Sequence, residues 1–424
     1  MKFTSATAVA AFAGIAAARQ CQNITVEVDV SARNGVFNQT TPVTNIDVTN
    51  FLLNLVQAGK NYSAAVLEGY ATVSGKYHIA ATYCEPDHGQ ANTVQLLTHG
   101  IGFDRSYWDL SYNNYNYSYV CEAVDQYGFA TFSWDRLGIA MSQHGEPVNE
   151  IQAWLEVDAL RALTTQLRNG QIPGINKKYN KVAHVGHSFG SQHTYALTAM
   201  YPGISDGIAL TGFSQNGSAV CGTAEFALGG NFIQANMVSS LSAYPNGYLA
   251  SADATAVQVN FFSPGDFDPA ILTLATYNGF AKPNPPPPPP PPTFPIPPTN
   301  PPRSQPVTVG ELLTFGGETG SINYFAGPVI IVTGERDTPY CGGNCYALPP
   351  NIPQLAFKNI PNAKNPEAFI VPGAGHGLNL EYTHPVTYST VNNYFVQNGL
   401  GPQNGQNGQN GQNGQNGHPH GPPK

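Results

Sequence analysis

The sequence predicts an α/β protein whose central sheet is mostly parallel and is covered by helices on both faces. Short apolar runs, typical of buried strands, alternate with longer segments whose apolar residues recur at helical spacing. Three helices are expected, at 48–58, 148–168 and 192–201. The predicted strands lie at 77–83, 94–97, 126–134, 182–185, 207–213, 328–332 and 368–371.

The order of these elements indicates one core that is interrupted once. Residues 19–65 are a leader whose only predicted element is the helix at 48–58. The alternation of strands and helices then continues to Ser214, stops, and resumes at residue 328. We therefore expect two parts of one core, 19–214 and 328–400, separated by an insertion at 215–327.

Residues 186–190 read Gly-His-Ser-Phe-Gly, a G-x-S-x-G motif, and lie between a predicted strand and a predicted helix. A strand that turns sharply into a helix is the setting in which this motif exposes a serine nucleophile. The two glycines leave room for the turn. The N-terminus of the following helix places free N–H groups and a partial positive charge near Ser188.

Three further turns follow predicted strands and carry polar residues. One lies before Ser188 in the sequence, and the two that lie after it contain Asp337 and His376. The strand at 94–97 ends in Thr-His-Gly-Ile-Gly, and the strand at 328–332 ends in Thr-Gly-Glu-Arg-Asp337. The strand at 368–371 ends in Pro-Gly-Ala-Gly-His376-Gly. With Ser188 these parts follow the order Ser, Asp, His. The chain resembles the α/β-hydrolase superfamily over about residues 66–398, apart from the insertion.

This resemblance implies a definite chemistry. A serine hydroxyl is a poor nucleophile until a base takes its proton, and His376 is the expected base for Ser188. Asp337 would hold the imidazole in the correct tautomer. The backbone N–H of Phe189, next after the nucleophile, is one expected oxyanion donor. By resemblance, the N–H of Ile101 is the other.

Two carboxylates compete for the role of the acid. Glu335 and Asp337 fall on the same side of a continuing strand, so spacing alone does not choose between them. The pattern of the resembled superfamily places the acid at Asp337, which we therefore prefer.

The other histidines have structural interpretations. We expect His99 to order the oxyanion loop, and His184 to be a hydrogen-bonded residue of the core. His187 and His193 are interpreted as local packing or surface residues.

A second motif resembles the D-R-x-G-x-G-x-S sequence of many α/β-hydrolases. It begins with Asp135 and Arg136, which we interpret as a structural ion pair. Ala140 replaces the second glycine, so we expect a changed loop turn and an unchanged fold.

The amino-acid composition restricts the classes of molecule that the chain is expected to bind. Only 10% of the residues are charged, against about a quarter in an average soluble domain, and the net charge is −8. Lysines and arginines do not cluster, which argues against binding to nucleic acid or to an anionic membrane surface.

The chain has the features of an exported protein. Residues 1–18 read as a signal peptide, with cleavage before Arg19, and no later run is long enough for an integral membrane span. Six cysteines suggest disulfides, and Cys341 and Cys345 could close a small loop after Asp337. Five sequons permit N-glycosylation, at Asn23, Asn38, Asn61, Asn116 and Asn216.

The insertion and the tail are compositionally distinct. In the resembled fold, this insertion is where a lid or cap is added. Its first part, 221–280, is rich in apolar residues, whereas the stretch 283–302 contains eight consecutive prolines and predicts an exposed spacer. Residues 401–424 include five Gln-Asn-Gly repeats and predict a disordered low-complexity tail.

Together these features predict a secreted serine hydrolase that cleaves small-molecule or lipid-like carboxylic esters without a metal or organic cofactor. Two alternatives remain open, an exported peptidase or aminopeptidase of the same fold and a catalytically silent wall or partner-binding protein. An aminopeptidase would need acidic groups in the insertion to hold a free amine. The available residues are Glu225, Asp253, Asp266, Asp268, Glu311 and Glu318.

Overall fold

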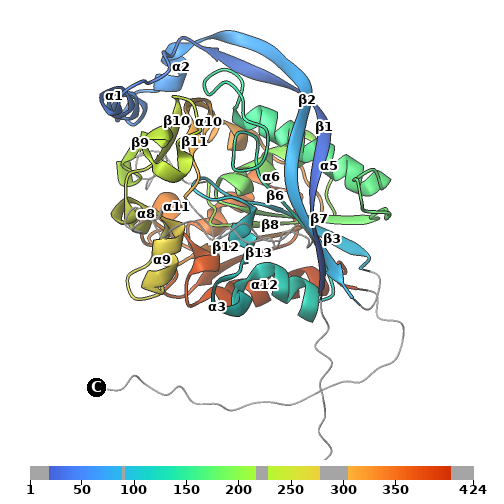
Figure 1. Ribbon diagram of the computed structural model, residues 1–424. Coiled ribbons are helices and arrows are strands. Elements are labelled where there is room, and N and C mark those ends of the chain that lie inside the picture. Colours follow the sequence, from blue (N-terminus) through green and yellow to red (C-terminus); the bar gives the residue numbers. More distant parts are fainter. Residues whose placement is uncertain (1–18, 88–90, 216–227, 277–303, 403–424) are drawn as a thin grey trace, which may run out of the picture.

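The computed structural model describes residues 19–87, 91–215, 228–276 and 304–402 (Figure 1). Its main sheet has eight strands, in the order β1 (Arg19–Phe37), β2 (Leu67–Pro86), β6 (Ala130–Trp134), β3 (Thr93–Thr98), β7 (Lys181–His187), β8 (Gly207–Thr211), β12 (Pro328–Gly334) and β13 (Lys364–Val371). The strands from β6 to β13 are parallel, whereas β1 and β2 are antiparallel. The predicted mostly parallel sheet is confirmed.

Helices cover both faces of the sheet, as the sequence predicts. The core helices are α5 (Ala153–Asn169), α6 (Phe189–Met200) and α12 (His384–Gln397), with the short turn η2 (Glu122–Gln126). Alternate residues of β7 divide between the two faces. Val182 belongs to the apolar cluster under α5 and α6, whereas Ala183 and Val185 belong to the cluster that includes α12.

The N-terminal leader contains a long strand that the sequence analysis missed. Residues 19–37 form β1, which pairs antiparallel with β2 as a ribbon. Alternating burial from Val26 to Ala32 is the period-two signal of this strand. Cys21 and Cys84 lie opposite each other in the register and form a disulfide. The helix expected at 48–58 is present as α1 (Asn45–Leu55), followed by α2 (Tyr62–Val66).

The described parts of the insertion form a small layer beside the core. Its strands are β9 (Phe232–Gln234), β10 (Tyr248–Ser251) and β11 (Val307–Thr308), and its helices are α8 (Ala254–Phe261), α9 (Pro269–Ala275) and α10 (Val309–Thr314). The Gln234 side chain donates to the carbonyl of Pro42, and its backbone N–H donates to the Asn45 side chain. These bonds join the insertion to the end of the β1–β2 ribbon.

Short elements complete the described fold. The tyrosine-rich loop after β3 contains η1 (Arg105–Trp108), β4 (Asp109–Leu110), α3 (Tyr112–Tyr115), β5 (Tyr117–Ser118) and α4 (Tyr119–Cys121). The others are η3 (Ala235–Met237), η4 (Ser239–Leu241), η5 (Gly317–Thr319), α11 (Thr338–Cys341), η6 (Pro353–Asn359) and η7 (Leu378–Leu380). The predicted signal peptide, the proline tract at 283–302 and residues 403–424 of the tail lie outside the described residues.

Two further expectations can be compared with the described residues. Cys341 and Cys345 form a disulfide that closes the small loop after Asp337. Cys121 has no disulfide partner among the described residues, and Cys221 lies outside them. None of the helices in these ranges combines the length and the apolar character needed to cross a membrane.

Ala140 shows how the departure from the D-R-x-G-x-G-x-S pattern is accommodated. Its φ is 48°, so alanine adopts here the left-handed conformation that favours glycine. Such a conformation costs an L-residue about 1–2 kcal/mol. The loop therefore holds alanine in a conformation that suits glycine, and it stores strain.

We predict that Ala140→Gly raises the free energy of unfolding by about 0.5–1 kcal/mol, because relief of strain exceeds the greater freedom of glycine in the unfolded chain. Urea denaturation measures the change. The matched control is Ala65→Gly, at an exposed position of α2, which should destabilise by about 1 kcal/mol. A loss of stability in Ala140→Gly would contradict the strain argument.

Candidate active site

Ser188 sits at the sharp turn between β7 and α6. Its φ of 56° and ψ of −117° are rare for a non-glycine residue. A Cβ at Gly186 would lie 2.3 Å from the carbonyl oxygen of Gly190, and a Cβ at Gly190 would lie 2.2 Å from that of Thr98. Both positions therefore require glycine, which explains why the G-x-S-x-G pattern produces this turn.

Ser188, His376 and Asp337 form a continuous chain of hydrogen bonds. The Ser188 Oγ lies 2.9 Å from His376 Nε2, and His376 Nδ1 lies 2.6 Å from Asp337 Oδ2. A carboxylate only accepts, so Nδ1 carries the proton and Nε2 is free to accept the serine proton. All three side chains are buried, with Ser188 only 3% exposed.

The structure places Asp337, and not Glu335, against the imidazole. The second oxygen of Asp337 accepts the backbone N–H of Tyr340 at 2.7 Å. Glu335 instead accepts the backbone N–H of Gly373, in the turn that leads to His376. The two carboxylates therefore hold different parts of the site, although they are only two residues apart.

Phe189 and Ile101, the expected oxyanion donors, belong to segments that meet at Ser188. Phe189 is the first residue of α6, so its backbone N–H lies outside the hydrogen-bond ladder of the helix. Ile101 follows Gly100, where an added Cβ would lie 2.7 Å from the Cβ of Ser188. The loop after β3 therefore passes directly beside the serine.

His99 fixes the orientation of the Gly100–Ile101 peptide. Its Nε2 accepts the backbone N–H of Arg136 at 3.0 Å, so its Nδ1 carries the proton and donates to the Gly100 carbonyl at 2.8 Å. In a trans peptide the Ile101 N–H points away from that carbonyl. Burial and the nearby Arg136 charge keep the pKa of His99 well below its usual range, so it stays neutral.

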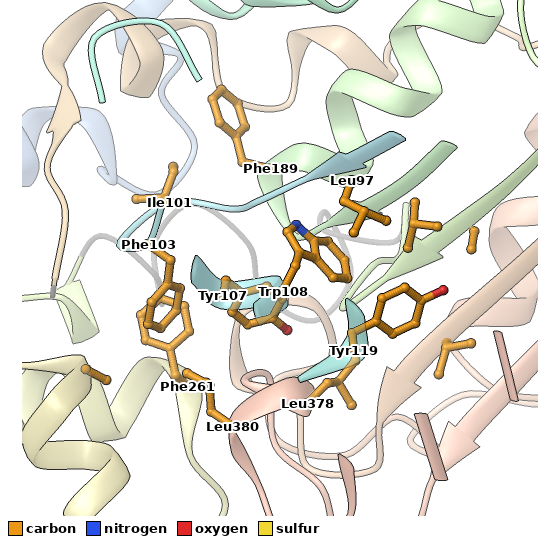
Figure 2. Packing of buried hydrophobic residues seen from close by; sticks show 14 of the residues in the cluster. Leu97, Ile101, Phe103, Tyr107, Trp108, Tyr119, Phe189, Phe261, Leu378 and Leu380 are labelled. Carbon is orange, nitrogen blue, oxygen red and sulfur yellow. The ribbon is translucent and has the colours of Figure 1, made fainter. Parts of the chain in front are cut away.

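Aromatic rings from distant segments surround His376. Figure 2 shows Phe103 and Phe261 side by side with Tyr107 next to them, and the Phe261 ring centre is 5.7 Å from that of His376. The Tyr107 ring stacks on the His187 ring, with their centres 4.4 Å apart, and the His187 ring centre lies 4.9 Å from that of His376. His187 is fully buried, so it is a packing residue of the site rather than a surface residue.

Glu381 ties the His376 loop to the insertion, and nothing in the local sequence indicated this role. Its carboxyl group accepts the backbone N–H groups of Gly375 and Ser263, the closest contacts being 2.8 and 2.7 Å. Burial raises the pKa of Glu381 well above its usual range. The Glu381 side chain thereby fixes Gly375, which precedes His376, and Ser263, which follows α8, relative to each other.

Comparison with known proteins identifies the family of this chain. A model of the alpha/beta hydrolase family matches residues 95–388. The chain belongs to the alpha/beta hydrolase family. The comparison with curated proteins finds no match.

Several solved structures match this chain at low sequence identity. A thermophilic esterase from Thermogutta terrifontis is 14% identical, with 76% of this chain and 94% of that chain covered and a TM-score of 0.48. An enol-lactonase from Burkholderia xenovorans LB400 is 13% identical, with 76% and 97% covered and a TM-score of 0.46. A bromoperoxidase from Bacillus anthracis is 16% identical, with 76% and 96% covered and a TM-score of 0.47. These names describe those proteins only.

A buried ionic network lies behind Phe189 in this α/β hydrolase. The Arg136 guanidinium is fully buried and donates to Glu156 of α5 and Glu311 of α10. His193 of α6 lies 2.7 Å from both Glu156 and Glu318. The centre of the Phe189 ring lies 4.4 Å from the centre of the His193 ring. The Cζ atom of Arg136 lies over the same ring, 4.9 Å from its centre.

The network corrects one sequence interpretation and decides between the two alternatives given for His193. Asp135 and Arg136 do not pair with each other, because Asp135 binds Arg105 instead. His193 is not a surface residue, since its ring is fully buried between two carboxyl groups. His184 is the expected core residue, with hydrogen bonds to Thr164 and Ser205.

The acidic residues proposed for amine binding have structural partners wherever they are described. Asp253 and Asp268 cap helices α8 and α9, and Asp266 binds Thr383. Glu311 and Glu318 belong to the ionic network. Glu225 lies outside the described residues. No group of three or more potential metal-ligating side chains is placed to hold a metal within the described ranges.

The ionic network predicts a pH dependence of stability. Burial raises the pKa of Glu156 and Glu311 from 4.5 to about 7. Between these values the folded protein holds protons that the unfolded chain releases, so stability falls as the pH rises from about 4.5 to 7.

Glu311→Gln should reduce the stability lost between about pH 4.5 and 7 by on the order of 1–3 kcal/mol, because the amide cannot titrate. Denaturant unfolding at several pH values measures the slope. The control is Glu27→Gln at an exposed position, where Lys76 lowers the pKa of the carboxyl group, so the slope in this range should stay unchanged. An unaltered slope in Glu311→Gln would show that this carboxyl group does not gain a proton on folding.

Proposed function

We propose that this chain is an exported serine hydrolase that cleaves carboxylic esters through an acyl-enzyme. The observation that carries the proposal is the buried chain of hydrogen bonds from Ser188 through His376 to Asp337. Serine triads with this geometry activate the hydroxyl by general base catalysis. Membership of a family of hydrolases supports the same conclusion.

The proposed reaction uses each group in turn. His376 Nε2 takes the Ser188 proton as Oγ attacks the ester carbonyl, and Asp337 stabilises the imidazolium that forms. The backbone N–H groups of Phe189 and Ile101 would bind the oxyanion of the tetrahedral intermediate. His376 then protonates the leaving alcohol. A water molecule repeats the sequence on the acyl-enzyme and releases the acid.

The surroundings of His376 favour a substrate with an apolar acyl or alcohol group. Phe103, Tyr107 and Phe261 are all buried beside the reacting groups. Aromatic side chains beside the reacting groups favour apolar ligands, since burial of apolar surface drives their binding. A small-molecule or lipid-like ester fits this environment better than a charged amine.

Export is the second part of the proposal. It rests on the predicted signal peptide at 1–18 and on the disulfides Cys21–Cys84 and Cys341–Cys345, which are typical of oxidising compartments. The four described sequon asparagines are exposed, as N-glycosylation would require. They are Asn23, Asn38, Asn61 and Asn116.

Removal of the Ser188 hydroxyl should abolish turnover while the fold is retained. Ser188→Ala should lower kcat by on the order of 10⁴–10⁶-fold, as in other serine triads. A panel of labelled esters and amides measures activity and also separates an esterase from the aminopeptidase alternative. A fluorophosphonate probe should label Ser188 in the wild type and nothing in the variant. Labelling of another serine would refute the assignment.

The two neighbouring carboxylates should differ sharply in effect. Asp337→Asn should lower kcat by roughly 10⁴-fold, because an amide favours the wrong imidazole tautomer. Glu335→Gln serves as the matched control, since the amide oxygen can still accept the Gly373 N–H. Its kcat should stay within about threefold of the wild type. The reverse ranking would assign the acid to Glu335.

The insertion and its proline tract should contribute differently to specificity. Phe261 touches His376, so Phe261→Leu should shift the preferred acyl chain length, measured as kcat/KM over a series of esters. The control Phe325→Leu changes a buried ring in a separate cluster and should not shift it. Phe232, also in the insertion, is buried in β9, and Phe226 lies outside the described residues.

Replacement of 283–302 by a short Gly/Ser linker should leave turnover nearly unchanged, because loop closure entropy varies slowly with length. A folded linker variant without activity, together with an unchanged acyl chain-length preference in Phe261→Leu, would show that the proline tract governs activity and that the apolar part of the insertion does not.

A further inference from the structure

Tyr340 lies against the proposed triad. Its backbone N–H donates to Asp337 at 2.7 Å, and its ring stacks on that of His376, with centres 5.5 Å apart and an angle of 28°. Its buried hydroxyl accepts a hydrogen bond from Gln192 at 2.9 Å, and Ser188 is among the groups that lower the pKa of the phenol. Gln192 lies one helical turn after Ser188, where its backbone N–H bonds to the Ser188 carbonyl.

The direction of the hydrogen bonds around Tyr340 can be assigned. The backbone N–H of Gly316 donates to Gln192 Oε1 at 3.0 Å, which identifies that atom as the amide oxygen. The other end of the amide is therefore the NH₂ group, and it donates to the Tyr340 oxygen at 2.9 Å. Because this bond uses the tyrosine oxygen as an acceptor, the phenolic proton remains available for a different partner.

Ser188 can accept that proton. Its own hydroxyl proton points to His376 Nε2, so the lone pairs of Oγ are free to accept. Burial raises the pKa of the Tyr340 phenol, and hydrogen bonds with Gln192 and Ser188 offset part of that shift. The phenol is therefore protonated at neutral pH and can donate throughout the reaction.

We propose that Tyr340 donates a hydrogen bond to Ser188 Oγ and that this bond accelerates the release of the serine from the acyl-enzyme. The inference rests on the function proposed above and extends it to a fourth side chain. The orientation of the phenol is fixed from the insertion, because Gly316 sets the Gln192 amide that in turn sets Tyr340.

The effect belongs to the second half of the reaction. In deacylation, water attacks the acyl carbon and gives its proton to His376 Nε2. The bond between the carbon and Oγ then breaks, the electron pair stays on Oγ, and His376 returns the proton to it. Tyr340 keeps its own proton and stabilises the negative charge that develops on Oγ. In acylation Oγ loses electron density, so the same hydrogen bond gives no advantage.

Tyr340→Phe tests the proposal, because it removes the hydroxyl and keeps the ring on His376. With a p-nitrophenyl ester, whose acylation is fast, kcat should fall roughly tenfold, the effect of about 1.4 kcal/mol. KM should fall in parallel, so that kcat/KM stays within about twofold. Stopped-flow measurements should show a burst of one nitrophenolate per enzyme, since acyl-enzyme accumulates.

Gln192→Glu gives a second, independent test with the tyrosine intact. A carboxylate would still accept the Gly316 N–H, but it would also accept the Tyr340 proton and draw it away from Ser188. The same fall in kcat and KM is expected. Tyr195→Phe is the control, a buried tyrosine of α6 whose hydroxyl donates to the Ser321 carbonyl, and its kinetics should match the wild type.

Reaction with a fluorophosphonate separates the outcomes, because it reports attack by Oγ without deacylation. Its rate should be unchanged within about twofold in Tyr340→Phe. An unchanged kcat in this variant, or a fall of kcat/KM and labelling rate along with kcat, would overturn the inference and leave the proposed esterase function standing. A wild-type protein that neither reacts with the probe nor hydrolyses any ester would overturn the proposed function, and the inference with it.

Discussion

The buried charge of Arg136 is the constraint on which the surroundings of the site depend. A guanidinium without water must be paired, and here carboxylates from α5 and from the insertion pair with it. The backbone N–H of the same residue orients His99, and the guanidinium packs over Phe189. One residue therefore joins the core, the insertion and both segments that carry the expected oxyanion donors.

Much of the fold could be predicted because its signals are local. Apolar strand runs and the glycines at 186 and 190 specify the parallel sheet and the turn at Ser188. The strand β1 was missed because only one of its faces is apolar, and charged or polar residues occupy the other. Its partner β2 begins 30 positions after β1 ends, at Leu67 against Phe37, so the pairing has no local signature beyond the period-two alternation.

In the proposed site, too, some residues have local sequence signals, whereas others are brought in only by tertiary packing. Ser188, Asp337 and His376 each follow a strand and a glycine turn, so the sequence predicts all three. Tyr107 and Phe261 reach His376 from separate loops, and only tertiary packing brings them there. The pairing of Arg136 was wrong, and the burial of His193 stayed undecided, because burial of a charged group depends on partners far away in the chain.

The insertion lies between the strands of the core, and this position sets the order in which the residues of the proposed triad are synthesised. The turn at Ser188 is made from residues in the first half of the chain, whereas Asp337 and His376 follow β12 and β13 at the edge of the sheet. A nascent chain that ends before these strands would hold a serine without a base. Under the proposed function, reactivity at Ser188 would therefore arise only after almost the whole core had left the ribosome.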